Sequence, residues 1–164
     1  MKDQNPEPPK NKTSISSEIE TRFLQSILNC SLFFQREINK ILLTFKLNYQ
    51  QLCVLNEIIW NGPVSQKELC EKLLFEKSNI SKIIKKLLKK GLVQMTVDPI
   101  DRRLTLLSEA PEGISVWKDS MQALNEFSVQ FSSVLAPEEI TYVIRQLKIL
   151  QTAVKKKERN QKMS

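Results

Sequence analysis

Apolar residues recur at steps of three and four from about Ser16 to Phe45, which is the period of an amphipathic α-helix. The stripe consists of Ile19, Phe23, Ile27, Cys30, Phe34, Ile38, Leu42 and Phe45. About 28 residues at 1.5 Å each give a helix of about 42 Å. One small core does not cover such a length, so we expect part of the stripe to meet another subunit.

Two shorter helices are predicted next, and each has a capping box at its start. In the first box Asn48 is followed three residues later by Gln51, and the helix ends at the strong breaker Asn61-Gly62-Pro63. In the second box Ser65 is followed by Glu68, and the short helix runs to about residue 73.

A further helix and a β-hairpin complete this central part. The segment Lys77 to Lys90 has helical spacing, and Gly91 ends it as a left-handed residue. Leu92 to Val97 and Arg103 to Leu107 are rich in β-branched or apolar residues, and turn-forming residues 98–102 join them. A short helix, a turn, a second helix and a hairpin make a winged helix-turn-helix.

The C-terminal part predicts two more amphipathic helices, which begin at Pro111 and Pro137. Proline is favoured in the first helical turn, where its missing N–H has no helical partner anyway. The predicted fold class is therefore mainly α with a small β-hairpin wing.

The two ends of the chain differ in composition from its centre. Residues 1–14 are polar and contain three prolines, which predicts a disordered leader rather than a signal peptide. No apolar run approaches the roughly 18 residues of a membrane span, so a cytoplasmic location is expected. One domain is predicted over 15–157, with a winged helix-turn-helix core over 48–108 and a basic tail over 158–164.

The net charge of +7 is concentrated in two segments. Residues 65–106 hold ten basic and five acidic residues, and residues 155–164 hold five basic residues and one acidic residue. A basic segment inside a folded region is the pattern expected for a polyanion partner. The basic end of the chain is interpreted instead as a solvated helix end.

The helix over 77–90 has six lysines and no acidic residue. In helix-turn-helix proteins the N-terminal residues of the second helix reach base edges, and the later lysines suit phosphates. Asparagine pairs with adenine, lysine with guanine, and serine with either. The predicted DNA-contacting residues of the two helices are Ser65, Gln66, Lys67, Lys77, Ser78, Asn79, Ser81, Lys82, Lys85 and Lys86.

The hairpin offers a second contact through Arg102 and Arg103 at its tip. An arginine on a narrow protrusion can enter the negative potential of a minor groove. Asp101 is a poor DNA ligand, and we predict that it orients one of the arginines by an ion pair. The alternative is a solvated turn with two surface arginines.

Three motifs together resemble the MarR family of bacterial regulators. They are Gly62-Pro63-Val64-Ser65-Gln66-Lys67-Glu68-Leu69, the Lys-Lys-Gly-Leu-Val that ends at Val93, and Asp98-Pro99-Ile100-Asp101-Arg102-Arg103. The resemblance covers about residues 20–155. It implies a homodimer held by the N-terminal helix over 16–45 and the C-terminal helices over 111–157. It also implies a palindromic operator with half-sites about 10 base pairs apart, and a repressor that releases DNA on binding a small ligand or on cysteine oxidation.

No enzyme, metal or cofactor site is predicted. The chain has no histidine, which removes the commonest general base and metal ligand, and no phosphate loop or nucleophile motif occurs. Cys30 is a candidate redox sensor, although a buried structural thiol is the preferred interpretation. Trp117, Phe33 and Phe34 could line a pocket for an aromatic or apolar ligand, although a place in the core is the preferred interpretation.

The predicted function is a sequence-specific double-stranded DNA-binding transcriptional regulator. One alternative is a winged-helix module that binds protein, which is disfavoured because protein interfaces are depleted in lysine. Another is a single-strand or RNA binder, which is disfavoured because the basic segment offers only Phe75 for stacking on bases.

Overall fold

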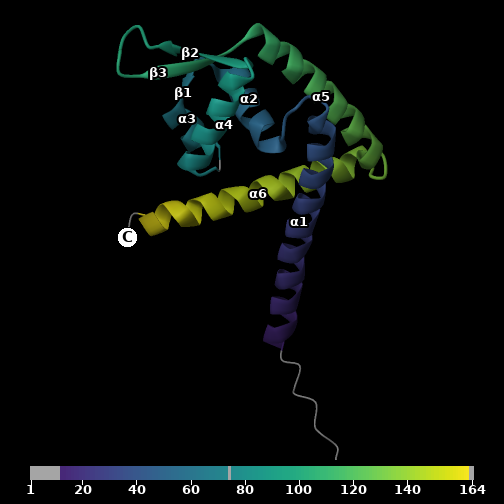
Figure 1. Ribbon diagram of the computed structural model, residues 1–164. Helices are drawn as coiled ribbons and strands as arrows, with labels where there is room; N and C mark the ends of the chain where they lie inside the picture. Colours follow the sequence, from purple (N-terminus) through teal and green to yellow (C-terminus); the bar gives the residue numbers. More distant parts are fainter. Residues whose placement is uncertain (1–11, 74, 163–164) are drawn as a thin grey trace, which may run out of the picture. The chain divides into compact units, whose positions relative to one another are not determined.

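The computed structural model describes residues 12–73 and 75–162 of the chain (Figure 1). The helices and strands, in chain order, are α1 (Lys12–Leu43), α2 (Tyr49–Asn61), β1 (Val64–Ser65), α3 (Gln66–Lys72), α4 (Lys77–Lys89), β2 (Val93–Val97), β3 (Thr105–Glu109), α5 (Pro111–Ser132) and α6 (Pro137–Lys162). The predicted fold class, mainly α with a small β wing, is confirmed.

The predicted leader and tail lie partly outside the described residues. Of the leader over 1–14, only residues 12–14 are described, and they belong to α1. The helix thus begins at Lys12 rather than Ser16, because no proline or glycine interrupts it there. The tail over 158–164 is described only as far as Lys162, where α6 ends.

Contacts divide the chain into two compact units, with the boundary inside α5 between Ser120 and Met121. The first unit holds α1 to β3 and the start of α5, and the second holds the rest of α5 and α6. Every residue predicted to contact DNA therefore belongs to the first unit.

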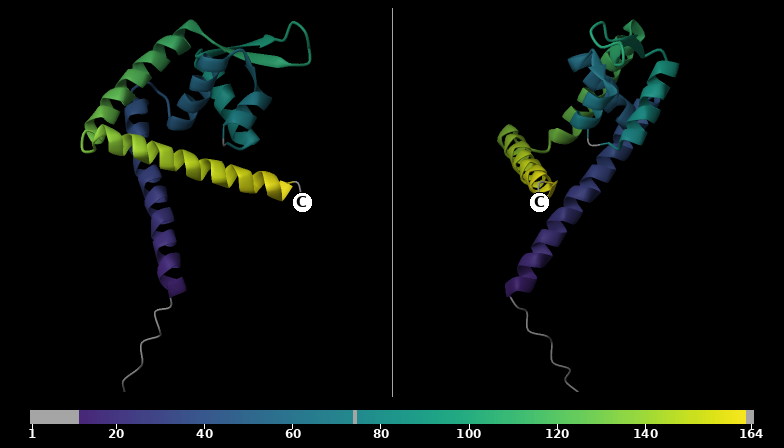
Figure 2. Two further views of the ribbon diagram at one scale, coloured as in Figure 1. Left: turned by 180° about the vertical axis from the view of Figure 1, so that it is seen from behind. Right: turned by 90° about the vertical axis from the view of Figure 1, so that its left-hand side faces the viewer.

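The three strands form one antiparallel sheet in the order β1-β3-β2. β2 and β3 make the predicted hairpin, with Val93 opposite Glu109 and Val97 opposite Thr105. The loop between them projects beyond α2, α3 and α4 in the left-hand view of Figure 2. β1, which pairs with β3 through Val64 and Leu107, was not predicted because two residues carry no strand periodicity.

The hydrophobic core lies between α2, α3, α4 and the sheet. Its buried apolar residues are Leu42, Leu47, Leu52, Val54, Leu55, Ile58, Val64, Leu69, Ile80, Ile83, Ile84, Leu87, Leu92, Val93 and Leu107. The four from α4 are those expected from its helical spacing. Their burial turns the opposite face of α4, which carries the lysines, toward solvent.

Most of the apolar stripe on α1 lies outside this core. Ile19 and Phe23 are exposed, whereas Leu42 near the C-terminal end of the helix is fully buried. Cys30 is exposed too, so the expectation of a buried thiol is wrong for the chain described here. The reason is that helical periodicity shows which residues share a face, but not whether anything covers that face.

The start of α5 packs closely against the winged-helix core. Gly113 is buried, and a Cβ atom built on it would lie 1.9 Å from the carbonyl oxygen of Leu92. The same oxygen accepts a hydrogen bond from the N–H of Ala110 at 3.1 Å. One turn further on, the indole of Trp117 donates to Asn56 Oδ1 of α2 at 3.0 Å. Together these contacts fix the first turns of α5.

Among the described residues, no helix combines the length and the apolar composition that a membrane crossing requires.

Candidate nucleic-acid interface

The start of α3 is held by the predicted capping box. The N–H of Ser65 donates to Glu68 Oε2 at 2.7 Å, and the N–H of Glu68 donates to Ser65 Oγ at 3.3 Å. The backbone hydrogen bond from Ser65 lowers the pKa of Glu68, so its carboxylate stays ionised at neutral pH. Ser65, a predicted DNA contact, therefore has a structural role in positioning α3.

Replacing Ser65 by alanine is expected to lower the free energy of unfolding by about 1 kcal/mol, because the first turn of α3 loses its cap. Urea denaturation followed by circular dichroism measures this loss. Ser115→Ala is the control, since Ser115 is exposed within α5. Equal stability of the two variants would contradict the capping role.

Polar residues of α3 and α4 bind to each other across the turn. Gln66 Nε2 donates to Ser81 Oγ at 2.7 Å, and Ser81 Oγ donates to the carbonyl of Lys77 at 3.0 Å. Both Gln66 and Ser81 were predicted to contact DNA. The structure shows that they also join the two helices of the motif by a side-chain hydrogen bond.

Asn79, near the start of α4, has a partner on α2. Its Nδ2 donates to Gln50 Oε1 at 3.3 Å, and both residues lie at the protein surface. Sequence reasoning missed Gln50, because this contact joins residues far apart in the chain. In the sequence, Gln50 is recognisable only as a polar residue in the first turn of a predicted helix.

The solvent face of α4 is cationic along its whole length. Its lysines, Lys77, Lys82, Lys85, Lys86 and Lys89, are all exposed. Of the ion pairs within residues 12–73 and 75–162, none uses a lysine of α4. Lys67 on α3 is also exposed and lies 4.0 Å from Glu71 of its own helix. These lysines are available to an anionic partner.

Lys90, one residue beyond α4, behaves differently from the lysines before it. Its Nζ donates to the carbonyl of Lys46 and, at 3.1 Å, to Gln51 Oε1. Burial, followed by the charges of Lys86 and Lys46, lowers the pKa of Lys90. This lysine therefore joins the end of α4 to the corner between α1 and α2, and contributes little to the open cationic face.

The loop at the tip of the hairpin is organised by two aspartates. Asp98 Oδ1 accepts the N–H of Ile100 at 2.7 Å and the N–H of Asp101 at 3.0 Å. These hydrogen bonds, the one from Asp101 first, lower the pKa of Asp98. The carboxylate that holds the loop is therefore ionised at every physiological pH, and this contribution is lost only as the pH falls through the lowered pKa.

Asp101 has a different role from the predicted one. Its Oδ1 accepts the backbone N–H of Arg103 at 3.0 Å, and among the described residues no ion pair involves Asp101. The expectation of an ion pair to an arginine side chain is therefore wrong. An aspartate in a tight turn readily bonds to a backbone N–H two residues ahead. Arg102 and Arg103 are both exposed.

A cationic recognition-type helix, a capped helix before it and an arginine-tipped hairpin thus lie in one compact unit. The MarR family model matches residues 45–104, which is this assembly from the start of α2 to the end of the hairpin loop. The segment over residues 45–104 is thus similar to the MarR family. The predicted resemblance to the MarR family is thereby confirmed, and members of that family are transcription regulators rather than enzymes.

The MarR fold extends over most of the chain. The ligand-free organohalide-sensing regulator RdhR is 18% identical, with a TM-score of 0.75 over 82% of this chain and 80% of that one. Wild-type MarR from E. coli is 20% identical, with a TM-score of 0.67 over 77% and 94%. MarR from Staphylococcus aureus is 16% identical, with a TM-score of 0.77 over 89% and 99%. A comparison with curated proteins found no match.

The other two cysteines of the chain, Cys53 and Cys70, do not form a metal-binding cluster with the acidic residues that the structure describes. Cys53 and Cys70 are half-buried, and burial raises the pKa of the Cys53 thiol, which lowers its reactivity. In the part of the chain that is described, no three Cys, Asp or Glu side chains are placed to hold a metal ion.

The aromatic residues considered for a ligand pocket differ from one another in their surroundings. Trp117 is half-buried against Asn56 and Trp60, whereas Phe33 is exposed and stacks edge-on with Phe34.

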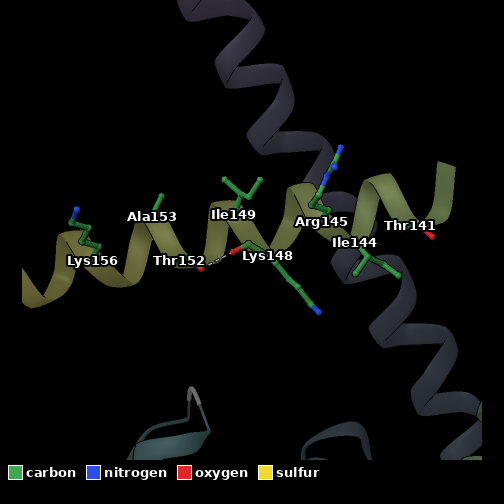
Figure 3. Close-up of a pocket in the computed structure, with 8 residues that line it drawn as sticks. All are labelled: Thr141, Ile144, Arg145, Lys148, Ile149, Thr152, Ala153 and Lys156. Atoms are coloured by element: carbon green, nitrogen blue, oxygen red, sulfur yellow. Dashed lines mark hydrogen bonds between the residues drawn. The ribbon is translucent and has the colours of Figure 1, made fainter. Parts of the chain in front are cut away.

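A hollow in the second unit follows one face of α6. All eight residues that line it belong to this helix, and they include Ile144, Ile149, Arg145 and Lys148 (Figure 3). Thr152 within it uses its hydroxyl internally, donating to the carbonyl of Lys148 at 2.8 Å. A hollow with walls from a single helix is an open helix face rather than an enclosed ligand cavity.

Proposed function

We propose that this protein is a sequence-specific double-stranded DNA-binding transcriptional regulator that acts in the cytoplasm as a homodimer. The observation that carries the proposal is the exposed lysine face of α4, which lies in the same unit as the exposed arginines of the wing. Five lysines on one helix suit the phosphates that border a major groove, and two arginines on a hairpin suit the adjacent minor groove.

Base reading is assigned to the N-terminal part of α4. Ser78 and Lys82 are exposed there, and Asn79 is half-buried with its amide bonded to Gln50. Lys85 and Lys86 lie further along the helix and are assigned to phosphates. Ser65, Gln66 and Lys67 at the start of α3 are assigned to the backbone of the same duplex.

Dimerisation is assigned to the apolar faces that each unit leaves exposed. On α1 these include Ile19, Phe23 and Leu24, and on α6 they include Val143 and Leu147. A monomer rarely exposes so much contiguous apolar surface, and a second copy of the chain would cover it. A symmetric dimer reads a palindromic operator, with one winged helix on each half-site.

Release of DNA is assigned to a small aromatic ligand or to oxidation of Cys30. Two structures with the same fold contain small aromatic ligands: RdhR was solved with 2,4-dichlorophenol, and S. aureus MarR with salicylate together with the non-aromatic kanamycin. Cys30 is exposed in the single chain and lies on the same stripe of α1 as Phe23, so its oxidation would act on the proposed dimer interface. The proposed regulator is a repressor in the absence of either signal.

Selection of bound duplexes from a random pool, with the mass of the protein in solution measured in parallel, tests the proposal. We expect a palindromic sequence and a dimer mass. A dimer that selects no sequence would contradict the proposal and favour an interaction module with a winged-helix fold.

Lys86→Ala is expected to weaken binding to all duplexes about equally and to reduce the slope of log K against log salt by about one per contact. Fluorescence anisotropy over a salt series measures both effects. Lys118→Ala on α5, which removes the charge of an exposed lysine outside α4, is the control and should leave the slope unchanged. A loss confined to one sequence would contradict the phosphate assignment.

A further inference from the structure

Ile100, at the tip of the wing, is the most exposed large apolar residue among those described. Its side chain is 95% exposed, compared with 60% for Val97 at the end of β2. Exposed apolar residues that occur singly need no explanation. The surroundings of Ile100 are what distinguish it, because Arg102 and Arg103 lie beside it on the same loop and are also exposed.

The backbone that carries Ile100 is held on both sides. Its own N–H donates to Asp98 Oδ1, and the N–H of Asp98 donates to the carbonyl of Leu104 at 3.0 Å, which closes the loop. Leu104 in turn donates its N–H to the carbonyl of Asp101 at 2.9 Å. An apolar side chain is therefore presented on a loop that its own hydrogen bonds hold, which reduces the conformational entropy lost when the side chain is inserted elsewhere.

We propose that Ile100 enters the DNA minor groove and partly unstacks one base step in each half-site, while Arg102 and Arg103 contact the flanking negative groove and phosphates. Proteins that bend DNA through the minor groove use isoleucine and similar apolar residues as wedges of this kind. The inference rests on the proposed DNA-binding function and adds to it a residue that reads the deformability of the duplex.

The two arginines favour DNA over a protein as the occupant of this tip. Ile100 is followed two and three positions later by exposed Arg102 and Arg103, and an apolar residue beside two cations matches an apolar stack of bases bordered by phosphates. Within residues 75–162, no described ion pair neutralises either arginine. Flexible steps such as TA and CA are therefore expected where the wing tip meets the operator.

The test uses the full-length protein and the duplex recovered by selection, with 2-aminopurine placed in turn at each step that flanks the α4 contacts. Unstacking of this base raises its fluorescence. We expect a rise at one symmetric pair of steps with the wild-type protein and loss of that rise with Ile100→Thr, which keeps the branch at Cβ but replaces the ethyl group with a hydroxyl. Affinity should fall by up to roughly tenfold. Val97→Thr is the matched control and should keep the rise.

The outcomes separate this inference from the proposed function. If the wild-type protein binds the duplex but raises the fluorescence at no step, or if Ile100→Thr raises it equally, the wedge is refuted while DNA binding stands. If no duplex is preferred at all, the proposed function fails first. Because Ile100 is almost fully exposed, its replacement is not expected to affect folding, and a thermal melt checks this.

Discussion

Replacing Gly113 by alanine is expected to destabilise the first unit by about 3 kcal/mol, at the upper end of the cost of overpacking. The added Cβ would lie 1.9 Å from the carbonyl oxygen of Leu92 and 2.8 Å from its carbonyl carbon. Both are backbone atoms, so no change of rotamer relieves the clash. The start of α5 would have to move away and lose the hydrogen bond from Ala110 to the same oxygen.

The direction of this effect is informative, because helix propensity alone predicts the opposite. Alanine within a helix is favoured over glycine by about 1 kcal/mol. We expect thermal denaturation to show a melting temperature lower by about 6–12 °C. Gly91→Ala is the matched control: Gly91 has φ +69° and no atom within 4 Å of an added Cβ, so only the left-handed backbone is penalised, by about 1–2 kcal/mol. A Gly113→Ala protein as stable as the wild type would refute the close approach.

Replacing Arg103 by alanine is expected to have the largest effect on DNA binding. Each lost arginine contact costs about 1–3 kcal/mol, which is roughly 5- to 150-fold in affinity, and the proposed dimer has two wings. The loop should keep its shape, because Asp101 bonds to the backbone N–H of residue 103 and not to its side chain. Anisotropy titration of the selected duplex, with circular dichroism and mass as folding controls, measures the loss.

Arg103→Lys separates charge from geometry at the same position. Lysine keeps the charge but lacks the planar fork of donors, so it should restore part of the affinity and little of the preference for one sequence. Unchanged affinity of Arg103→Ala would show that the wing does not contact DNA and that its arginines are solvated surface residues.

The parts of the fold that the sequence predicted depend on interactions between residues close in the chain. Both capping boxes join residues three apart, and both are present as predicted at Asn48 and Ser65. Gly91 has the positive φ expected of a residue that ends a helix. The cationic face of α4 followed from the spacing of its apolar residues, which placed the lysines on the opposite side.

The features that were missed depend on contacts between residues distant in the chain. β1 exists only because Val64 lies beside Leu107, and Gln66 bonds to Ser81 across the turn. The exposure of Cys30 depends on what covers α1, which the spacing of apolar residues does not show. The predicted ion pair of Asp101 failed for another reason. In a short loop the backbone N–H of Arg103 and the arginine side chains compete for the carboxylate, and the nearer donor, the N–H, forms the hydrogen bond.

Lys90 gives the winged-helix core a mechanical connection to the long helix that precedes it. Its ammonium group donates to the carbonyl of Lys46, where the chain leaves α1, and to the side chain of Gln51 at the start of α2. Any displacement of that corner must either be transmitted to the end of α4 or break both hydrogen bonds. The orientation of the lysine face, the proposed DNA contact, is thereby tied to the position of α1, although the sequence of the basic helix contains no sign of this dependence.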